Sequence, residues 1–340
     1  MSAAKSKRTQ YKHAKPKLLG AIDQRRPKRG EAEIMGRKEF GSLKNIDIAR
    51  MNAGLEIAGS NPIEDGELGH STRVLVQATL PHGPPPKDQE LWIRRNGFAT
   101  LTVQSGFKID TKTGEKQLVG LPYGTLPRLI MLYLCSEAKR LKTPEISLGD
   151  NLNDFMKELG LNRTGGDRGD ITRLKTQAER LVQSRMQYQW DDGKTSAGFS
   201  ASIAKKWLFF WDQQSPNQPS LFQNTVTLSA DFYQEIIEHP IPLHLGAIQA
   251  LKGSSFDLDL YTWLNYRVAT LRKPAVIRWS ALQQQLGADY SDTKDFAKNA
   301  RKRLVNVQAV WQGLECEIVR GGFRLKPCEP SVPKLLKKPH

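Results

Sequence analysis

The chain has 340 residues, 39% of them hydrophobic, with 51 Lys and Arg against 35 Asp and Glu, a net charge of +16. This length predicts two domains with room for tails. The charge favours polyanionic partners, nucleic acid ahead of an anionic membrane, although a merely basic soluble enzyme stays open. No apolar run reaches the ~18 residues of a membrane span. The basic start lacks the apolar region of a signal peptide, so we expect a cytoplasmic protein.

The cysteines do not form a recognisable metal or disulfide pattern. Cys135, Cys316 and Cys328 are widely separated, and no pair has CxxC spacing. Cys135 stands within an apolar run, which is typical of a buried core residue. We therefore predict no zinc site and no cofactor.

The N-terminal segment is strongly basic. Residues 1–50 hold 14 Lys and Arg against 5 Asp and Glu and few aromatics. Such a composition predicts a largely disordered tail, which we extend to residue 69. The tail either adds non-specific affinity for phosphates or only keeps the protein soluble. Within it, a weakly amphipathic stretch, 34–57, predicts a helix that forms when docked.

The middle of the chain predicts first strands and then helices. Asn96-Gly97 is a strong hairpin signal. Pro127 suits the first turn of a helix, and Gly160 ends another. In order, the patterns predict a strand over 72–80, an extended loop at 81–86, hairpin strands at 91–93 and 98–103, helices over 125–142 and 152–159, a turn at 164–167, a longer helix over 167–184, strands at 186–190, 206–211 and 224–228, and a helix capped by Ser229.

A similar order follows in the last third of the chain. Ser280 and Asp292 predict N-caps of a short helix and a long basic helix, and Gly321-Gly322 predicts a tight turn. The predicted elements are a hinge at 240–242, helices over 256–272, 281–286 and 292–307, strands at 310–314 and 315–320, and a strand at 323–325.

Helix, short helix, longer helix and β-hairpin is the order of a winged helix, a helix-turn-helix with an added wing. The sequence thus predicts an α+β chain of two tandem winged-helix domains with a disordered basic N-terminal tail. The predicted segments are a tail at 1–69, a first winged-helix domain at 70–240, a second at 241–328 and a C-terminal tail at 329–340.

The second basic helix is the stronger candidate for reading DNA. Helical phase places its apolar residues on one side and four cations on the other. A polar, basic outer face suits phosphates and base edges in the major groove, although a merely solvated face has the same pattern. Arg303 falls near the apolar side, where we expect it to snorkel or pair. The candidate contacts are Lys294, Lys298, Arg301 and Lys302.

The first long helix has a polar but less charged outer face. Arg173, Gln177 and Arg180 are predicted to point away from the core, and Arg and Gln suit guanine and adenine edges. This face reads bases, lies on phosphates or is free for protein contacts. In the second wing, Arg320 and Arg324 are candidate phosphate contacts. In the first, Lys205 and Lys206 are equally compatible with plain surface cations.

No catalytic signature is present. The chain lacks G-x-x-x-x-G-K-[ST], which argues against an ATP-driven helicase or loader. No set of Ser, His and Asp or of Cys and His converges on a motif, and the metal cluster of a nicking enzyme is missing. We therefore predict that the protein is not an enzyme.

Several ordered motifs resemble plasmid-encoded RepA replication proteins. The resemblance spans roughly residues 70–325 and is strongest in the first predicted winged helix; the basic tail is outside it. The motifs are Pro122-Tyr123-Gly124-Thr125-Leu126-Pro127-Arg128-Leu129, Ser136-Glu137-Ala138, Glu145-Ile146-Ser147-Leu148-Gly149, Asp154-Phe155-Met156-Lys157-Glu158-Leu159-Gly160 and Gly165-Gly166-Asp167-Arg168-Gly169.

This resemblance implies an initiator that binds directly repeated double-stranded origin sites, called iterons, helps to melt an AT-rich segment and recruits the host initiator and replicative helicase. It also implies homodimers through the first winged helix and repression of the protein's own gene. Arg168, within the last motif, joins the candidate DNA contacts. The rivals are a transcriptional regulator of the same fold, a nicking enzyme and a basic architectural protein.

Overall fold

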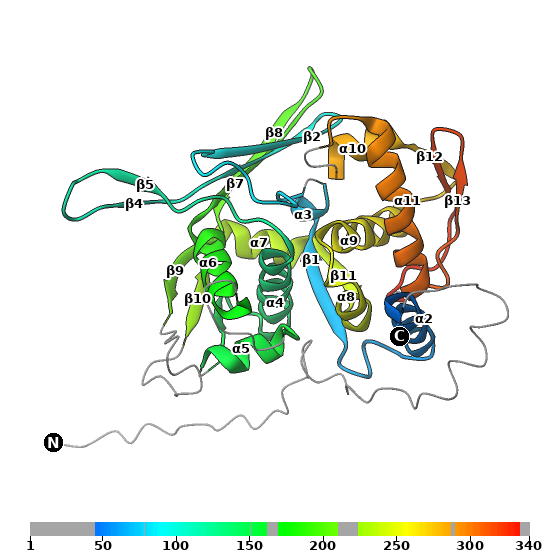
Figure 1. Ribbon diagram of the computed structural model, residues 1–340, viewed down its shortest axis with the longest axis horizontal. Coiled ribbons are helices and arrows are strands. Elements are labelled where there is room, and N and C mark those ends of the chain that lie inside the picture. The colour runs from blue at the N-terminus through cyan, green and yellow to red at the C-terminus, as the bar shows by residue number, and fades with distance from the viewer. Residues whose placement is uncertain are drawn as a thin grey trace, which may run out of the picture.

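The computed structural model describes residues 45–77, 79–149, 151–161, 169–209, 224–286 and 290–333, arranged as Figure 1 shows. The helices are α2 (Asn45–Ala58), α3 (Arg73–Gln77), α4 (Thr125–Leu141), α5 (Leu152–Glu158), α6 (Asp170–Gln183), α7 (Ala230–Glu238), α8 (Leu245–Leu251), α9 (Ser255–Thr270), α10 (Trp279–Leu286) and α11 (Thr293–Val310). The strands are β1 (Leu68–Thr72), β2 (Leu91–Asn96), β3 (Ala99–Gln104), β4 (Phe107–Ile109), β5 (Lys116–Leu118), β6 (Glu145–Ser147), β7 (Arg185–Asp191), β8 (Ser196–Ser202), β9 (Ala204–Leu208), β10 (Thr225–Leu228), β11 (Pro240–His244), β12 (Ala275–Arg278), β13 (Cys316–Val319) and β14 (Gly322–Leu325).

A first unit consists of three helices and a small antiparallel sheet, with α4 at its centre. In chain order it consists of α4, β6, α5, α6, β9 and β10, and its strands lie in the order β6-β10-β9. The helix starts at Thr125, directly after Gly124, whose positive φ of 78° suits glycine. Because most of α4 is buried, it is the central helix of the unit, as its apolar sequence predicts.

A second unit repeats this arrangement. It consists of α9, β12, α10, α11, β13 and β14, and its strands lie in the order β12-β14-β13. Helix, strand, helix, helix and two strands therefore recur in the same order and with the same strand pairing. The expected order is therefore present in part, because β7 and β8 stand between α6 and β9 of the first unit.

The strand predicted at 186–190 takes a partner that the sequence did not indicate. It is β7, which pairs with β3 and β8 in a separate sheet of order β2-β3-β7-β8. The partner predicted at 206–211 overlaps β9, which pairs with β10, while residues 210–211 lie outside the described part of the chain. The hairpin expected as the first wing is thus wrong in its pairing, because the unpredicted strand β8 lies between its two strands.

Other local expectations need correction. The segment predicted as a strand at 72–80 forms α3 over Arg73–Gln77. Ser280 lies inside α10, which begins at Trp279, and is therefore no N-cap. The strand expected at 310–314 is instead the end of α11 and a turn, because α11 continues to Val310. The turn expected at 164–167 lies outside the described residues.

A two-stranded ladder joins distant parts of the chain. β1 pairs with β11 from Leu68↔His244 to Thr72↔Pro240, so the predicted hinge at 240–242 is part of a strand. Ahead of β1, α2 packs against α8 and α11, at the foot of α11 in Figure 1. The predicted tail at 1–69 therefore ends in ordered, docked elements from Asn45 onward, and the helix expected within 34–57 is present.

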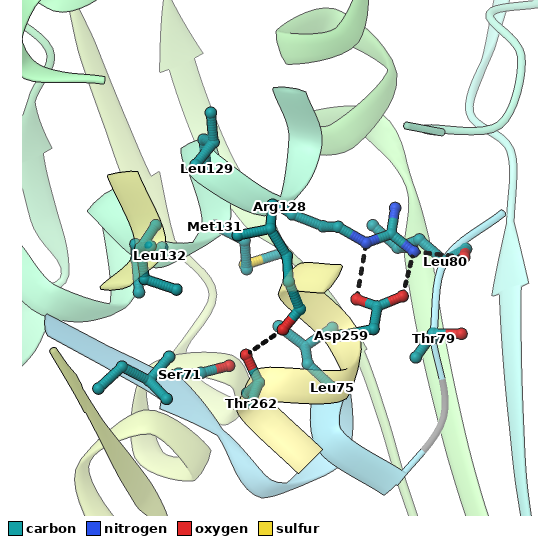
Figure 2. Close-up of a pocket in the computed structure, with 13 residues that line it drawn as sticks. Ser71, Leu75, Thr79, Leu80, Arg128, Leu129, Met131, Leu132, Asp259 and Thr262 are labelled. Carbon is teal, nitrogen blue, oxygen red and sulfur yellow. Dashed lines mark hydrogen bonds and ion pairs between the residues drawn. The ribbon is translucent and has the colours of Figure 1, made fainter. Parts of the chain in front are cut away.

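A buried ion cluster links the two units. Arg128 of α4 donates through Nε and Nη2 to the two carboxylate oxygens of Asp259 of α9, both at 2.7 Å, as Figure 2 shows. His82 Nε2 lies 2.8 Å from Asp259 Oδ2. Burial alone would raise the pKa of Asp259, but the Arg128 charge and the His82 hydrogen bond lower it below its ordinary value. The carboxylate is thus held ionised between the units.

Candidate nucleic-acid interface

Helix α11 starts and packs as its sequence predicts. The Asp292 carboxylate accepts from the Lys294 amide at 2.9 Å, which satisfies one of the free N–H groups of the first turn. Phe296, Ala300 and Leu304 recur at four-residue spacing and are buried. This apolar stripe fixes which side of α11 faces its own unit and leaves the opposite side to solvent.

The four predicted cations lie on that opposite side. Lys294, Lys298, Arg301 and Lys302 are all exposed, and none forms an ion pair with a residue that the structure describes. The Arg301 guanidinium lies 5.5 Å from the centroid of the Trp279 ring of α10, a distance at which cation–π attraction holds it in place. The outer face of α11 therefore offers four positive charges to an anionic partner.

The hairpin after α11 adds cations at the edge of the same unit. Gly321 has a φ of 79°, which closes the turn between β13 and β14. Arg320 stands exposed in this turn. Arg324 is also exposed but forms an ion pair with Glu317, so part of its charge is already neutralised. Of the two predicted wing contacts, Arg320 is the less constrained.

The structure also brings an unpredicted cation to this hairpin. β12 pairs with β14 so that Arg278 lies opposite Gly322, and its side chain is exposed. Arg278 was not among the predicted contacts, because the four residues of β12 show no distinctive pattern. In the first unit, Lys205 and Lys206 of β9 are exposed as expected.

The outer face of α6 differs from the prediction. Gln177 is 5% exposed, and its Oε1 accepts from the Tyr123 amide at 2.9 Å, so the expectation that it points away from the protein is wrong. Arg180 donates to the carbonyls of Val119 and Leu121 and lies 5.4 Å from the Tyr123 ring centroid. The loop before α4 therefore covers this part of α6, and both side chains hold that loop.

Only the first turns of α6 remain open. Arg173 is exposed and forms an ion pair with Asp170 at 3.2 Å. Thr176 is exposed beside it. Arg173 and Thr176 line a cleft of about 570 Å³, to which the second unit contributes Tyr290 and Arg303. Of the predicted contacts on this helix, Arg173 alone keeps an accessible charge, while Arg168 lies outside the described residues.

Other kinds of site find little support in the described part of the chain. The small cavity drawn in Figure 2 measures about 50 Å³ and is mostly apolar, with room for little more than water molecules. Among the residues that the structure describes, no three His, Cys, Asp or Glu side chains gather as metal ligands. Across the same residues, no helix has the length and apolar character to cross a membrane.

The two similar units, with a cationic helix and hairpin on the second, define a basic α+β protein. Residues 121–281 match the family described as plasmid encoded RepA protein, so over this span the chain is similar to that family. The resemblance inferred from the motifs is confirmed for these residues.

Two further comparisons add little. A solved structure titled "Crystal structure of SeMet derivatives of domain2 and domain 3 of RctB" is similar, with 12% sequence identity and a TM-score of 0.45. The similarity covers 73% of this chain and 94% of that chain. No curated protein matches the sequence significantly.

Proposed function

We propose that the protein initiates plasmid replication by binding directly repeated origin sites with two winged helices. Each unit has the helix, strand, helix, helix, strand, strand order, with the first strand paired to the last. In a helix-turn-helix protein with a wing, the last helix enters the major groove and the wing contacts the backbone. These positions correspond to α11 and the β13–β14 hairpin in the second unit, and to α6 and β9–β10 in the first.

The observation that carries the proposal is the cationic face of α11, whose side chains form no ion pair with any residue that the structure describes. Lys294, Lys298, Arg301 and Lys302 follow one side of an 18-residue helix whose other side is buried. Lysine and arginine on such a helix reach phosphates and guanine edges. A merely solvated helix face would not explain further exposed cations in the same unit. Arg278 of β12 lies opposite Gly322, and Arg320 lies in the β13–β14 turn.

The two units do not contribute equally in this proposal. The second unit reads bases through α11, while the first adds contacts through Arg173 and the exposed lysines of β9. Tethering the two readers raises the effective concentration of the second once the first is bound. A site of about two helical turns follows if both units bind one face of the duplex.

The remaining steps rest on the family. From the similarity to plasmid encoded RepA protein, we extend to this chain the melting of an adjacent AT-rich segment, whose base pairs separate most readily, and the recruitment of the host initiator and helicase. We extend to this chain dimerisation through the first unit and repression of its own gene. We propose no catalytic activity of its own.

Binding is tested with a duplex that carries the repeats next to the gene and a scrambled duplex of equal length, at ~150 mM salt. We expect the repeats to bind ~10³-fold or more tightly and the preference to disappear in Lys298→Ala/Arg301→Ala. A control variant, Lys108→Ala/Lys112→Ala, removes the same charge from the β4–β5 hairpin, on the side of the molecule away from α11 in Figure 1. Equal affinity of the wild type for both duplexes would contradict the proposal.

Initiation is separated from gene regulation by a replication assay. A plasmid whose only origin carries the repeats and the AT-rich segment should be maintained with the wild type and lost with Lys298→Ala/Arg301→Ala. The host is of a species in which the natural plasmid replicates but is itself free of that plasmid. If the wild type binds the repeats but cannot maintain the test plasmid there, the protein is a regulator and not an initiator.

A further inference from the structure

Helix α2 docks very closely on the C-terminal end of α11. A Cβ atom at Gly54 would lie 1.9 Å from the backbone oxygen of Ala309, so only glycine fits at this contact. The end of α2 is also fixed, because the Ser60 hydroxyl lies 2.8 Å from Nε2 of the buried His244. Both observations indicate that α2 has one fixed seat on α8 and α11.

A buried polar network stands at this seat. Arg50 of α2 is 8% exposed and donates through Nη1 to Asn306 Oδ1 of α11 at 3.2 Å. Its Nη2 lies 3.7 Å from Asp257 Oδ2 of α9. Asn306 Nδ2 donates to the same carboxylate at 3.0 Å, and Arg303 Nη1 lies 3.5 Å from it. Three helices thus meet on one buried carboxylate.

This network fixes how α11 is turned about its axis. Arg303 and Asn306 hold the inner side of the helix to Asp257, and Lys302 and Arg301 stand on the outer side of the same turns. Base readout depends on side chains being placed to within about an ångström. A shift of α11 on its seat therefore moves its outer cations relative to base edges, while diffuse attraction to phosphates changes little.

We propose that Arg50 is a positioning residue that orients α11 for sequence-specific reading, which makes α2 a working part of the second unit. This inference rests on the proposed function. Arg50 is itself too buried to contact a duplex, so it acts through Asn306 and Asp257. Its loss should reduce discrimination between sequences without removing a phosphate contact.

The test compares Arg50→Ala, Arg50→Lys and Leu55→Ala in the full-length chain. Leu55 lies on α2 outside the network and is 63% exposed, which makes its variant the matched control. Affinity is measured for repeat and scrambled duplexes over a range of salt concentrations. For Arg50→Ala we expect the preference for repeats to fall about tenfold, the discrimination that one bidentate base contact supplies. Scrambled-duplex affinity and its salt dependence should stay at the wild-type values. Arg50→Lys should retain part of the preference for repeats, and Leu55→Ala should retain all of it.

A second measurement does not depend on DNA. Amide hydrogen exchange of the free protein should become faster in α11 of Arg50→Ala and stay unchanged in α6. An unaltered preference, or an equal loss on both duplexes with a smaller salt dependence, would overturn the proposal. Unchanged exchange in α11 would also overturn it. If the wild type itself shows no preference, the proposed function fails, while the exchange measurement still decides whether Arg50 holds α11.

Discussion

Two cations on equivalent helices have opposite surroundings. Lys298 of α11 is exposed and unpaired among the described residues, whereas Arg180 of α6 donates to two carbonyls of the loop that precedes α4. A cation on the corresponding helix of each unit therefore has a different role. One offers charge to a partner, and the other stabilises the fold.

Arg180→Ala should lower the free energy of unfolding by about 1–3 kcal/mol, because charge-assisted hydrogen bonds and a contact with the Tyr123 ring are lost. Lys298→Ala should leave the free energy of unfolding within about 0.5 kcal/mol of the wild type. Urea unfolding measures both values. In duplex binding, Lys298→Ala should lose more affinity for the repeats than Arg180→Ala. A strong loss of repeat affinity in a fully folded Arg180→Ala protein would show that Arg180 does contact DNA.

Two histidines should make stability depend on pH. Burial lowers the pKa of His70 and of His244 to about 4, whereas an unfolded imidazole titrates near 6.5. The unfolded chain therefore binds more protons between these values, and stability is retained above pH 6.5 and lost as the pH falls towards 4. Each imidazole contributes a slope of at most about 1.4 kcal/mol per pH unit. Urea unfolding between pH 7.5 and 4.5 should show this loss, and a His70→Asn/His244→Asn variant should show less of it. An equal slope in both proteins would contradict the assignment.

The candidate site was only partly predictable at this scale. The faces of α11 follow from local periodicity, so the exposure of Lys294, Lys298, Arg301 and Lys302 could be predicted. Gln177 could not be placed, because the amide that covers it belongs to Tyr123, 54 residues away in sequence. Arg50 was hidden for the same reason, since its partner Asn306 is 256 residues away.

At the scale of elements, capping and turn residues gave some boundaries correctly, although the N-cap predicted at Ser280 was wrong. α11 begins where Asp292 caps it, and Gly321 turns the hairpin. Short strands such as β6 and β12 were not predicted, since three or four residues show no clear alternation and gain their partners only from tertiary pairing.

The β13–β14 hairpin depends on the absence of a side chain at Gly322. A Cβ atom there would lie 2.0 Å from the backbone oxygen of Ile277 in β12. Gly322→Ala should therefore push β12 and β14 apart and cost a few kcal/mol of stability, because the neighbour is backbone and cannot rotate away. Gly313→Ala is the matched control, since its Cβ would meet nothing closer than 3.8 Å. Thermal unfolding of the two variants checks this, and equal melting temperatures would show that the sheet adjusts freely.

At the scale of the molecule, the Arg128–Asp259 pair joins the two units through buried groups. Asp259→Ala would leave the Arg128 guanidinium buried without its counter-charge, which typically costs about 3–5 kcal/mol. Glu317→Ala removes a carboxylate from an exposed pair and should cost no more than about 1 kcal/mol. We expect the wild type to unfold in one calorimetric transition, because the units share this contact. Two well-separated transitions in the wild type would show that the units are independent.

The pairing of Thr72 with Pro240 brings together the two ends of the segment 73–239, which contains the first unit. In the language of domain architecture, residues 73–239 are a guest inserted into a host that consists of α2, β1 and everything from β11 onward. The host is discontinuous in sequence, so a fragment that starts at residue 241 lacks α2 and uncovers the surface of α8 and α11 beneath it. The guest, by contrast, enters and leaves at neighbouring points, as loops that accept whole domains do. Evolution can therefore exchange or reshape the guest while α11 keeps its position on α2, α8 and α9.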